Sequence, residues 1–225
     1  MAAAKRRGLD GIAITNHDRF AGHDEAQRAA GPDFVIIPGE EVFSSAGEII
    51  GLFLTHEIPG GCSPLATAEA IRAQGGVVVI PHPFDRYRRG AIGEAALNNL
   101  NRAGLVDAVE IFNGRMMHPL DNREARRWAQ AHDIPVTVGS DGHSTLEYGA
   151  SYNLIAPFTD AASFKVNLRG AMQHMHRAPQ WVHFVSTFEK RRRKAWEATA
   201  ISMVRGNVPA DSARQPTAQG TETHA

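Results

Sequence analysis

Residues 11–18 read GIAITNHD, a short apolar run that ends at Thr15 and is followed at once by Asn16, His17 and Asp18. Apolar residues fill nearly every position of the run instead of alternating with polar ones, which is typical of a strand buried on both faces of a sheet. The pattern recurs along the chain and predicts strands at Gly11–Thr15, Phe34–Ile37, Ile49–Leu54, Val77–Ile80, Ala108–Phe112, Pro135–Val138 and Asn153–Ala156.

Helical patterns lie between these strands. Ser63 and Pro64 predict the N-cap and the first residue of one helix, and the pair Gly75 and Gly76 predicts its end. Another helix is expected over about residues 120–132. The alternation of strands and helices predicts an α/β fold with a parallel sheet wrapped by helices.

The composition is that of one globular domain. Hydrophobic residues make up 43% of the 225 residues, and 24 basic residues balance 24 acidic ones, so no net charge favours nucleic acid or a membrane surface. The single cysteine, Cys62, excludes an intramolecular disulfide, and no apolar run approaches the length of a membrane span. We therefore expect a cytoplasmic protein without a membrane partner.

The C-terminal part of the chain differs in character from the rest. The globular domain is expected to occupy residues 1–187. Residues 188–205 predict a basic helix that contains Lys190–Lys194, for which a solvated helix face is favoured over a nucleic-acid patch. Residues 206–225 are rich in small and polar residues and are predicted to be disordered.

The residues at the ends of the strands include many histidines and acids. Those that directly follow a predicted strand, or open one, are His17, Glu40, Glu41, Glu48, His82, Asn113, Asp141 and His143. Because the carboxyl ends of parallel strands lie on one face of a barrel, we expect these side chains to converge on one site. Each motif alone could be an ordinary turn or helix cap, but their repeated position at strand ends favours a functional site.

The residue types indicate the chemistry. Imidazole combined with carboxylate suits Zn²⁺, Mn²⁺ or Fe²⁺, whereas an all-oxygen cage would suit Mg²⁺ or Ca²⁺. Several such ligands can hold two or three ions about 3.5–4 Å apart, the spacing of two-metal phosphoryl-transfer sites. The sequence contains no glycine-rich phosphate loop, and Cys62 has no evident catalytic partner, so no competing mechanism is indicated.

The ordered set of motifs resembles the polymerase-and-histidinol-phosphatase (PHP) superfamily. The matching stretches are Ile14–Asp18, Pro38–Glu41, Gly47–Gly51, Ile80–Pro83, Glu110–Asn113 and Gly139–His143. The resemblance implies a distorted, TIM-like (β/α)7 barrel with a trinuclear metal centre at its carboxyl face. It also implies hydrolysis of phosphoesters such as histidinol phosphate, nucleotides or nucleic-acid ends.

The resemblance also implies roles for individual residues. The implied metal ligands are His17, Glu41, Glu48, His82, Asp141 and His143. Catalytic roles are implied for Glu41, His82 and Asp141, with Glu41 rather than Glu40 as the carboxylate that bridges two ions. Substrate binding is expected from Asn113 and from the arginines of neighbouring loops, for which a solvent-exposed loop position is an equal alternative: Arg86, Arg88, Arg89 and Arg115.

Three departures from the family pattern stand out. Glu48 occupies the place where many members have a metal-binding histidine, which would change the charge and the metal preference. Asn16 replaces the more frequent aspartate before His17. The family's opening strand, with an Asp-Leu-His-x-His pattern, is expected to be missing before Met1, together with two histidines and an acid of the first metal site. A late start codon is the favoured explanation, and a truncated pseudoenzyme is the alternative.

The leading hypothesis is metal-dependent hydrolysis of a phosphoester on a small phosphorylated substrate or a nucleic-acid end. A complete site would hold two or three Mn, Zn or Fe ions. The alternative is a catalytically inactive binding module that retains the PHP fold and a partial metal site. A polymerase accessory domain is less favoured, because only a polar tail follows the domain. Metal content and turnover of an aryl phosphate would separate the first two hypotheses.

Overall fold

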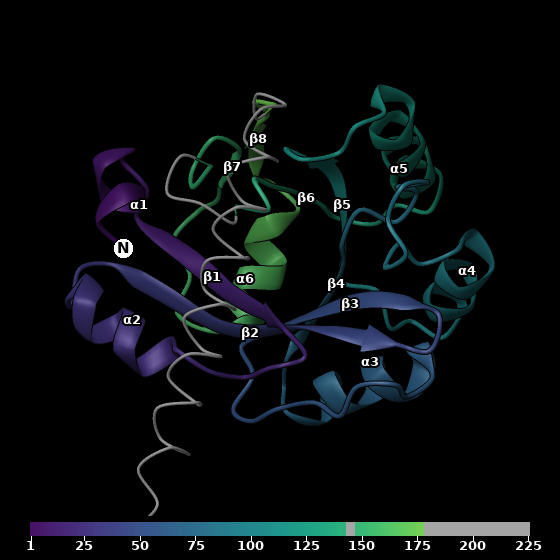
Figure 1. Ribbon diagram of the computed structural model, residues 1–225, viewed down its shortest axis with the longest axis horizontal. Helices are drawn as coiled ribbons and strands as arrows, with labels where there is room; N and C mark the ends of the chain where they lie inside the picture. The colour runs from purple at the N-terminus through teal and green to yellow at the C-terminus, as the bar shows by residue number, and fades with distance from the viewer. Residues whose placement is uncertain (143–146, 178–225) are drawn as a thin grey trace, which may run out of the picture. The chain divides into compact units, whose positions relative to one another are not determined.

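A computed structural model describes residues 1–142 and 147–177, and these form a mixed α/β fold. Six strands make one curled sheet in the order β1 to β6, as Figure 1 shows. These strands are β1 (Gly11–His17), β2 (Val35–Ser44), β3 (Gly47–Leu52), β4 (Val77–Ile80), β5 (Ala108–Asn113) and β6 (Val136–Gly139). Two short strands, β7 (Tyr152–Leu154) and β8 (Met172–His174), form a separate antiparallel pair.

The sheet is not entirely parallel, which corrects the prediction from sequence. Strand β3 runs antiparallel to both β2 and β4, whereas the pairs β1–β2, β4–β5 and β5–β6 are parallel. Only Ser45 and Ala46 connect β2 to β3, and a parallel connection needs a crossover of a dozen or more residues. The connection therefore forms a hairpin, and Gly47 takes a positive φ of 133° at its end.

The edges of the sheet differ in how they are covered. Within the described residues, β1 has β2 as its only strand partner, so the side of β1 that would face a preceding strand forms an open edge. At the other edge, the predicted strand at 153–156 does not extend the sheet. The side chain of Asn153 instead accepts from the amide of Val138 at 3.0 Å and donates to its carbonyl at 2.9 Å, thereby replacing a strand partner for β6.

The helices cover the sheet as the strand–helix alternation predicts. They are α1 (Ala2–Arg6), α2 (His23–Ala30), α3 (Pro64–Ala73), α4 (Glu94–Arg102), α5 (Pro119–Ala131) and α6 (Ala161–Leu168). Helix α3 packs on β3 and β4, α5 packs on β5, and α2 packs on β2 (Figure 1). The amide of Ala66 donates to the Ser63 side chain at 3.2 Å, which is the predicted N-cap of α3.

The main core lies between the sheet and helices α3, α4 and α5. It is built from fully buried aliphatic side chains such as Ile49, Ile71, Ile80 and Leu97. No helix among the described residues is long and apolar enough to cross a membrane. The basic helix predicted at 188–205 and the tail predicted at 206–225 lie outside the described residues, as does His143.

Candidate metal centre

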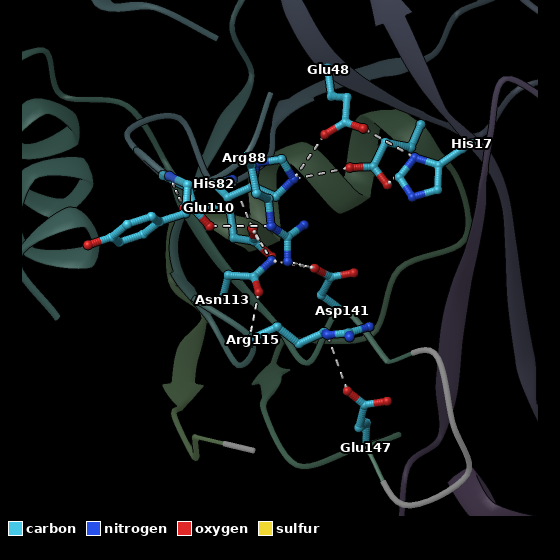
Figure 2. Close-up of polar contacts among 12 residues, drawn as sticks. His17, Glu48, His82, Arg88, Glu110, Asn113, Arg115, Asp141 and Glu147 are labelled. Atoms are coloured by element: carbon cyan, nitrogen blue, oxygen red, sulfur yellow. Dashed lines mark hydrogen bonds and ion pairs between the residues drawn. The ribbon is translucent and has the colours of Figure 1, made fainter. Parts of the chain in front are cut away.

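Two histidines and two glutamates from successive strands meet at one point of the sheet. His17 is the last residue of β1, Glu41 lies in β2, Glu48 is the second residue of β3, and His82 follows β4 by two residues. The strand register places His17 directly beside Glu41. Figure 2 shows the side chains of His17, Glu48 and His82 converging. The structure therefore brings together four of the six predicted metal ligands.

Side-chain alternation along β2 separates Glu41 from Glu40. Glu41 points into this group, whereas the buried carboxylate of Glu40 accepts a hydrogen bond from the backbone amide of Ile58 at 2.9 Å. Burial raises the pKa of Glu40 above its ordinary value. Because successive side chains of a strand point to opposite faces, Glu40 cannot share the site with Glu41.

The four side chains form a closed ring of imidazole–carboxylate contacts. Nδ1 of His17 lies 3.3 Å from an oxygen of Glu41 and 3.3 Å from an oxygen of Glu48. Nε2 of His82 lies 3.3 Å from the other oxygen of Glu41 and 3.4 Å from the other oxygen of Glu48. Each carboxylate thus contacts both imidazoles.

The donor set of this ring fits a divalent ion. One ligand atom from each of His17, Glu41 and Glu48 lies within 4.8 Å of the others. With Zn–ligand distances of about 2.0–2.2 Å, donor atoms around one ion stand roughly 3–4 Å apart, close to the spacing of the ring contacts. Nitrogen and carboxylate donors together suit Zn²⁺, Mn²⁺ or Fe²⁺.

Contacts within the ring shift the pKa values of three of its members toward their charged forms. The hydrogen bond with Glu48 is the largest effect on His17 and raises its pKa. Burial would raise the pKa of Glu48, but the hydrogen bond with His17 and the charges of both histidines outweigh it, so this pKa is lowered. For His82, burial favours the neutral ring, yet the hydrogen bond to Glu41 raises the pKa overall.

A second group of polar side chains adjoins the ring through Glu110 in β5. One oxygen of Glu110 accepts from the backbone amide of His82 at 2.9 Å and from the Asn113 side chain at 3.0 Å. The same Asn113 amide donates to Asp141 at 3.3 Å. Glu110 therefore links the backbone of one predicted ligand to the side-chain partner of another. Its pKa is raised, chiefly by burial.

The ends of β4 and β6 hold their residues in uncommon backbone conformations. His82 has a φ of 29° and Asp141 a φ of 48°, values that residues other than glycine rarely adopt. Positive φ at non-glycine residues tends to cluster at functional sites. Gly139 has a steric role, since a Cβ there would lie 2.3 Å from Oε1 of Glu110.

The predicted substrate-binding arginines have different partners. Arg88 contacts Asp141, a predicted metal ligand, and its Nε lies 3.3 Å from Asp85. Arg86 instead forms an ion pair of 2.7 Å with Asp121, which is fully buried in the first turn of α5. Arg115 lies 3.5 Å from the buried carboxylate of Glu147. Arg89 is exposed. Arg88 therefore makes direct contact with a predicted ligand, as Figure 2 shows.

Sequence reasoning did not single out four acids of this region: Asp85, Glu110, Asp121 and Glu147. Glu110 belongs to one of the stretches that match the PHP superfamily, and a carboxylate in an otherwise apolar strand indicates a buried polar role. Asp85 follows His82 by three residues and precedes a run of arginines, which was a second signal. The partners of Arg86 and Arg115 lie 35 and 32 residues further along the chain, and no local pattern identifies them.

Comparison with known proteins adds a sequence match and a fold match. A family model described as PHP-associated matches residues 119–169. The uncharacterized protein MJ0417 of Methanocaldococcus jannaschii is 38% identical over 117 residues, which are 52% of this chain and 49% of that protein. The match therefore spans about half the length of that relative.

Two solved structures share the fold at 17% sequence identity, a level that shows the fold alone. PsfC from Pseudomonas syringae has a TM-score of 0.62, covering 85% of this chain and 87% of that one. A two-domain protein from Bacteroides vulgatus is described as containing a predicted PHP-like metal-dependent phosphoesterase. Its TM-score is 0.56, and the match covers 77% of this chain and 60% of that one. The PHP-associated sequence match and the PHP-like fold both agree with the resemblance of the motifs to the PHP superfamily.

Proposed function

We propose that this domain hydrolyses phosphoesters with the help of divalent ions of the Mn, Zn or Fe type. The observation that carries the proposal is the ring of His17, Glu41, Glu48 and His82, whose donor atoms fit such an ion. The similarity of the chain to PHP-like metal-dependent phosphoesterases supports the reaction class. We further propose a nucleotide or a nucleic-acid end phosphate as the substrate.

A bound ion would supply a water of lowered pKa and neutralise negative charge on the phosphate. In this proposal His17, Glu41, Glu48 and His82 hold the ion, and Asp141 with His143 completes the ligand set. Glu110 holds the backbone of His82 and the amide of Asn113 in place. Arg88 and Asn113 then bind and orient the phosphate oxygens, because both stand beside Asp141.

A matched pair of variants in β2 tests the proposal. Glu41→Gln removes the charge of a ligand, whereas Glu40→Gln makes the same change on the opposite face of the strand. With Mn²⁺ or Zn²⁺ added, we expect Glu41→Gln to lower the rate of aryl phosphate hydrolysis by about 100-fold or more. Glu40→Gln should stay within a few-fold of the unaltered protein.

Metal content per chain is measured on the same samples by elemental analysis. Equal rates and equal metal content in the two variants would refute the assignment of Glu41. An unaltered protein that binds metal but hydrolyses no aryl phosphate, nucleotide or end-phosphorylated oligonucleotide would support an inactive binding module instead. Preference among these substrates tests the finer proposal.

A further inference from the structure

Arg88 occupies a central position beside the candidate metal centre. Its side chain is only 25% exposed and reaches Asp141, whose side chain is 13% exposed, from the loop that follows β4. Figure 2 shows the guanidinium of Arg88 and the carboxylate of Asp141 pointing toward one another. The ring glutamate Glu48 also interacts electrostatically with Arg88. The guanidinium therefore lies in the field of several predicted metal ligands.

The loop holds Arg88 at two different points. Nε of Arg88 lies 3.3 Å from Asp85, which is almost fully buried, and Nη2 donates to Asp141. Asp85 is fixed in turn, because its own amide donates to the carbonyl of His82 at 3.1 Å and its carboxylate accepts from the amide of Tyr87 at 3.0 Å. The contact with Asp85 can therefore persist if the contact with Asp141 is lost.

Arg86 and Arg115 pair with other acids. Arg86 contacts Asp121 through Nε and Nη2, and Arg115 contacts Glu147. Neither Asp121 nor Glu147 belongs to the predicted metal ligands. Arg88 instead pairs with Asp141, a residue that would also bind an ion.

A guanidinium and a divalent ion compete for the same carboxylate and repel each other at short range. We propose that Arg88 is a built-in counter-ion of Asp141 that a divalent ion displaces, and that the displaced guanidinium then binds the substrate phosphate. The inference rests on the proposed function. Ion binding and phosphate binding are then coupled through the Arg88 side chain. The contact with Asp85 holds this side chain while its guanidinium moves away from Asp141.

Calorimetric titration of the metal-stripped protein with Mn²⁺ tests the competition without an activity assay. Arg88→Gln removes the competing charge and should raise the affinity of Mn²⁺ for one site about tenfold, within the range usual for coupled sites. Arg88→Lys keeps the charge and should stay closer to the unaltered protein. The matched control is Arg72→Gln, since Arg72 pairs with Asp107 at 2.9 Å and has a similar side-chain exposure of 32% outside the site.

Titration of the Mn²⁺-loaded proteins with inorganic phosphate tests the second step. Arg88→Gln should weaken phosphate binding about tenfold, whereas Arg72→Gln should leave it unchanged. Unchanged or weaker Mn²⁺ binding in Arg88→Gln, with a preserved thermal transition, overturns the inference but leaves the proposed function standing. No Mn²⁺ binding by any of the four proteins overturns both. If Arg88→Gln does not fold, Arg88→Lys and Asp85→Asn still decide, because loss of the fixed point should also weaken phosphate binding.

Discussion

Gly90 controls the position of Glu48, and a single methyl group at Gly90 is expected to disable the metal centre. A Cβ at this position would lie 2.0 Å from Oε2 and 2.3 Å from Cδ of Glu48. Ordinary contact begins near 3.4 Å, so in Gly90→Ala the carboxylate must move by about 1.4 Å, whereas ligand positions tolerate roughly 0.2 Å. The contacts of Glu48 with His17 at 3.3 Å and His82 at 3.4 Å would then be broken.

The same change should have little effect on folding. The colliding atoms are the far end of a flexible side chain, and the φ of Gly90 is not in the left-handed region, so we expect a loss of stability of no more than about 1 kcal/mol. Mn²⁺ affinity, measured by calorimetry, should fall at least about tenfold while the thermal midpoint shifts by a few degrees. Gly170→Ala is the control, because its Cβ would meet nothing closer than 3.9 Å. Mn²⁺ affinity within threefold of the unaltered protein in Gly90→Ala would refute the reasoning.

Three further changes test other parts of the structure. Glu48→His should shift the preference from Mn²⁺ toward Zn²⁺, since it replaces a carboxylate by an imidazole; equal relative affinities by competition titration would contradict this. Asn153→Ala removes both hydrogen bonds to the backbone of Val138 and should lower the free energy of unfolding by about 1–3 kcal/mol in urea titration. Asp160 caps α6, and the hydrogen bonds from Ser163 hold its pKa below the ordinary 3.8. A lowered folded-state pKa stabilises the fold above pH 3.8 and ceases to do so as pH falls through that pKa, so the deficit of Asp160→Ala should shrink in acid; a deficit independent of pH would exclude the effect.

Much of the sheet could be predicted because its strands are buried runs bounded by polar residues. The structure places a strand at six of the seven predicted positions in the main sheet, with shifted boundaries. The seventh predicted strand does not join the main sheet: within the described part of the chain, β7 pairs with β8, and the Asn153 side chain bonds to β6. A side-chain amide that replaces a strand leaves no periodic pattern, so the sequence gives no sign of it.

The candidate site could be predicted only in part for a related reason. His17, Glu41 and His82 follow from strand positions, because β1, β2 and β4 run in the same direction and bring their carboxyl ends to the same side of the sheet. The roles of the arginines depend on which acids they meet, and those acids come from distant segments. Arg88 meets Asp141 across 53 residues of chain, a contact that neither motif nor periodicity predicts.

The antiparallel direction of β3 explains how a residue at the start of a strand joins a site made by strand ends. If β3 ran parallel to its neighbours, Glu48 would lie at the amino ends of the strands, away from the site. The hairpin places Glu48 opposite Phe43, and residues directly opposite each other in an antiparallel pair point to the same face. Phe43 shares a face with Glu41 because it is two residues further along β2. A register slip of one residue would turn Glu48 to the other face. Such a slip would move a residue with a side chain into the place of Gly47, where a Cβ would lie 2.6 Å from the backbone of Ile92. This close contact resists the slip, and the short hairpin thereby fixes the second carboxylate of the metal centre.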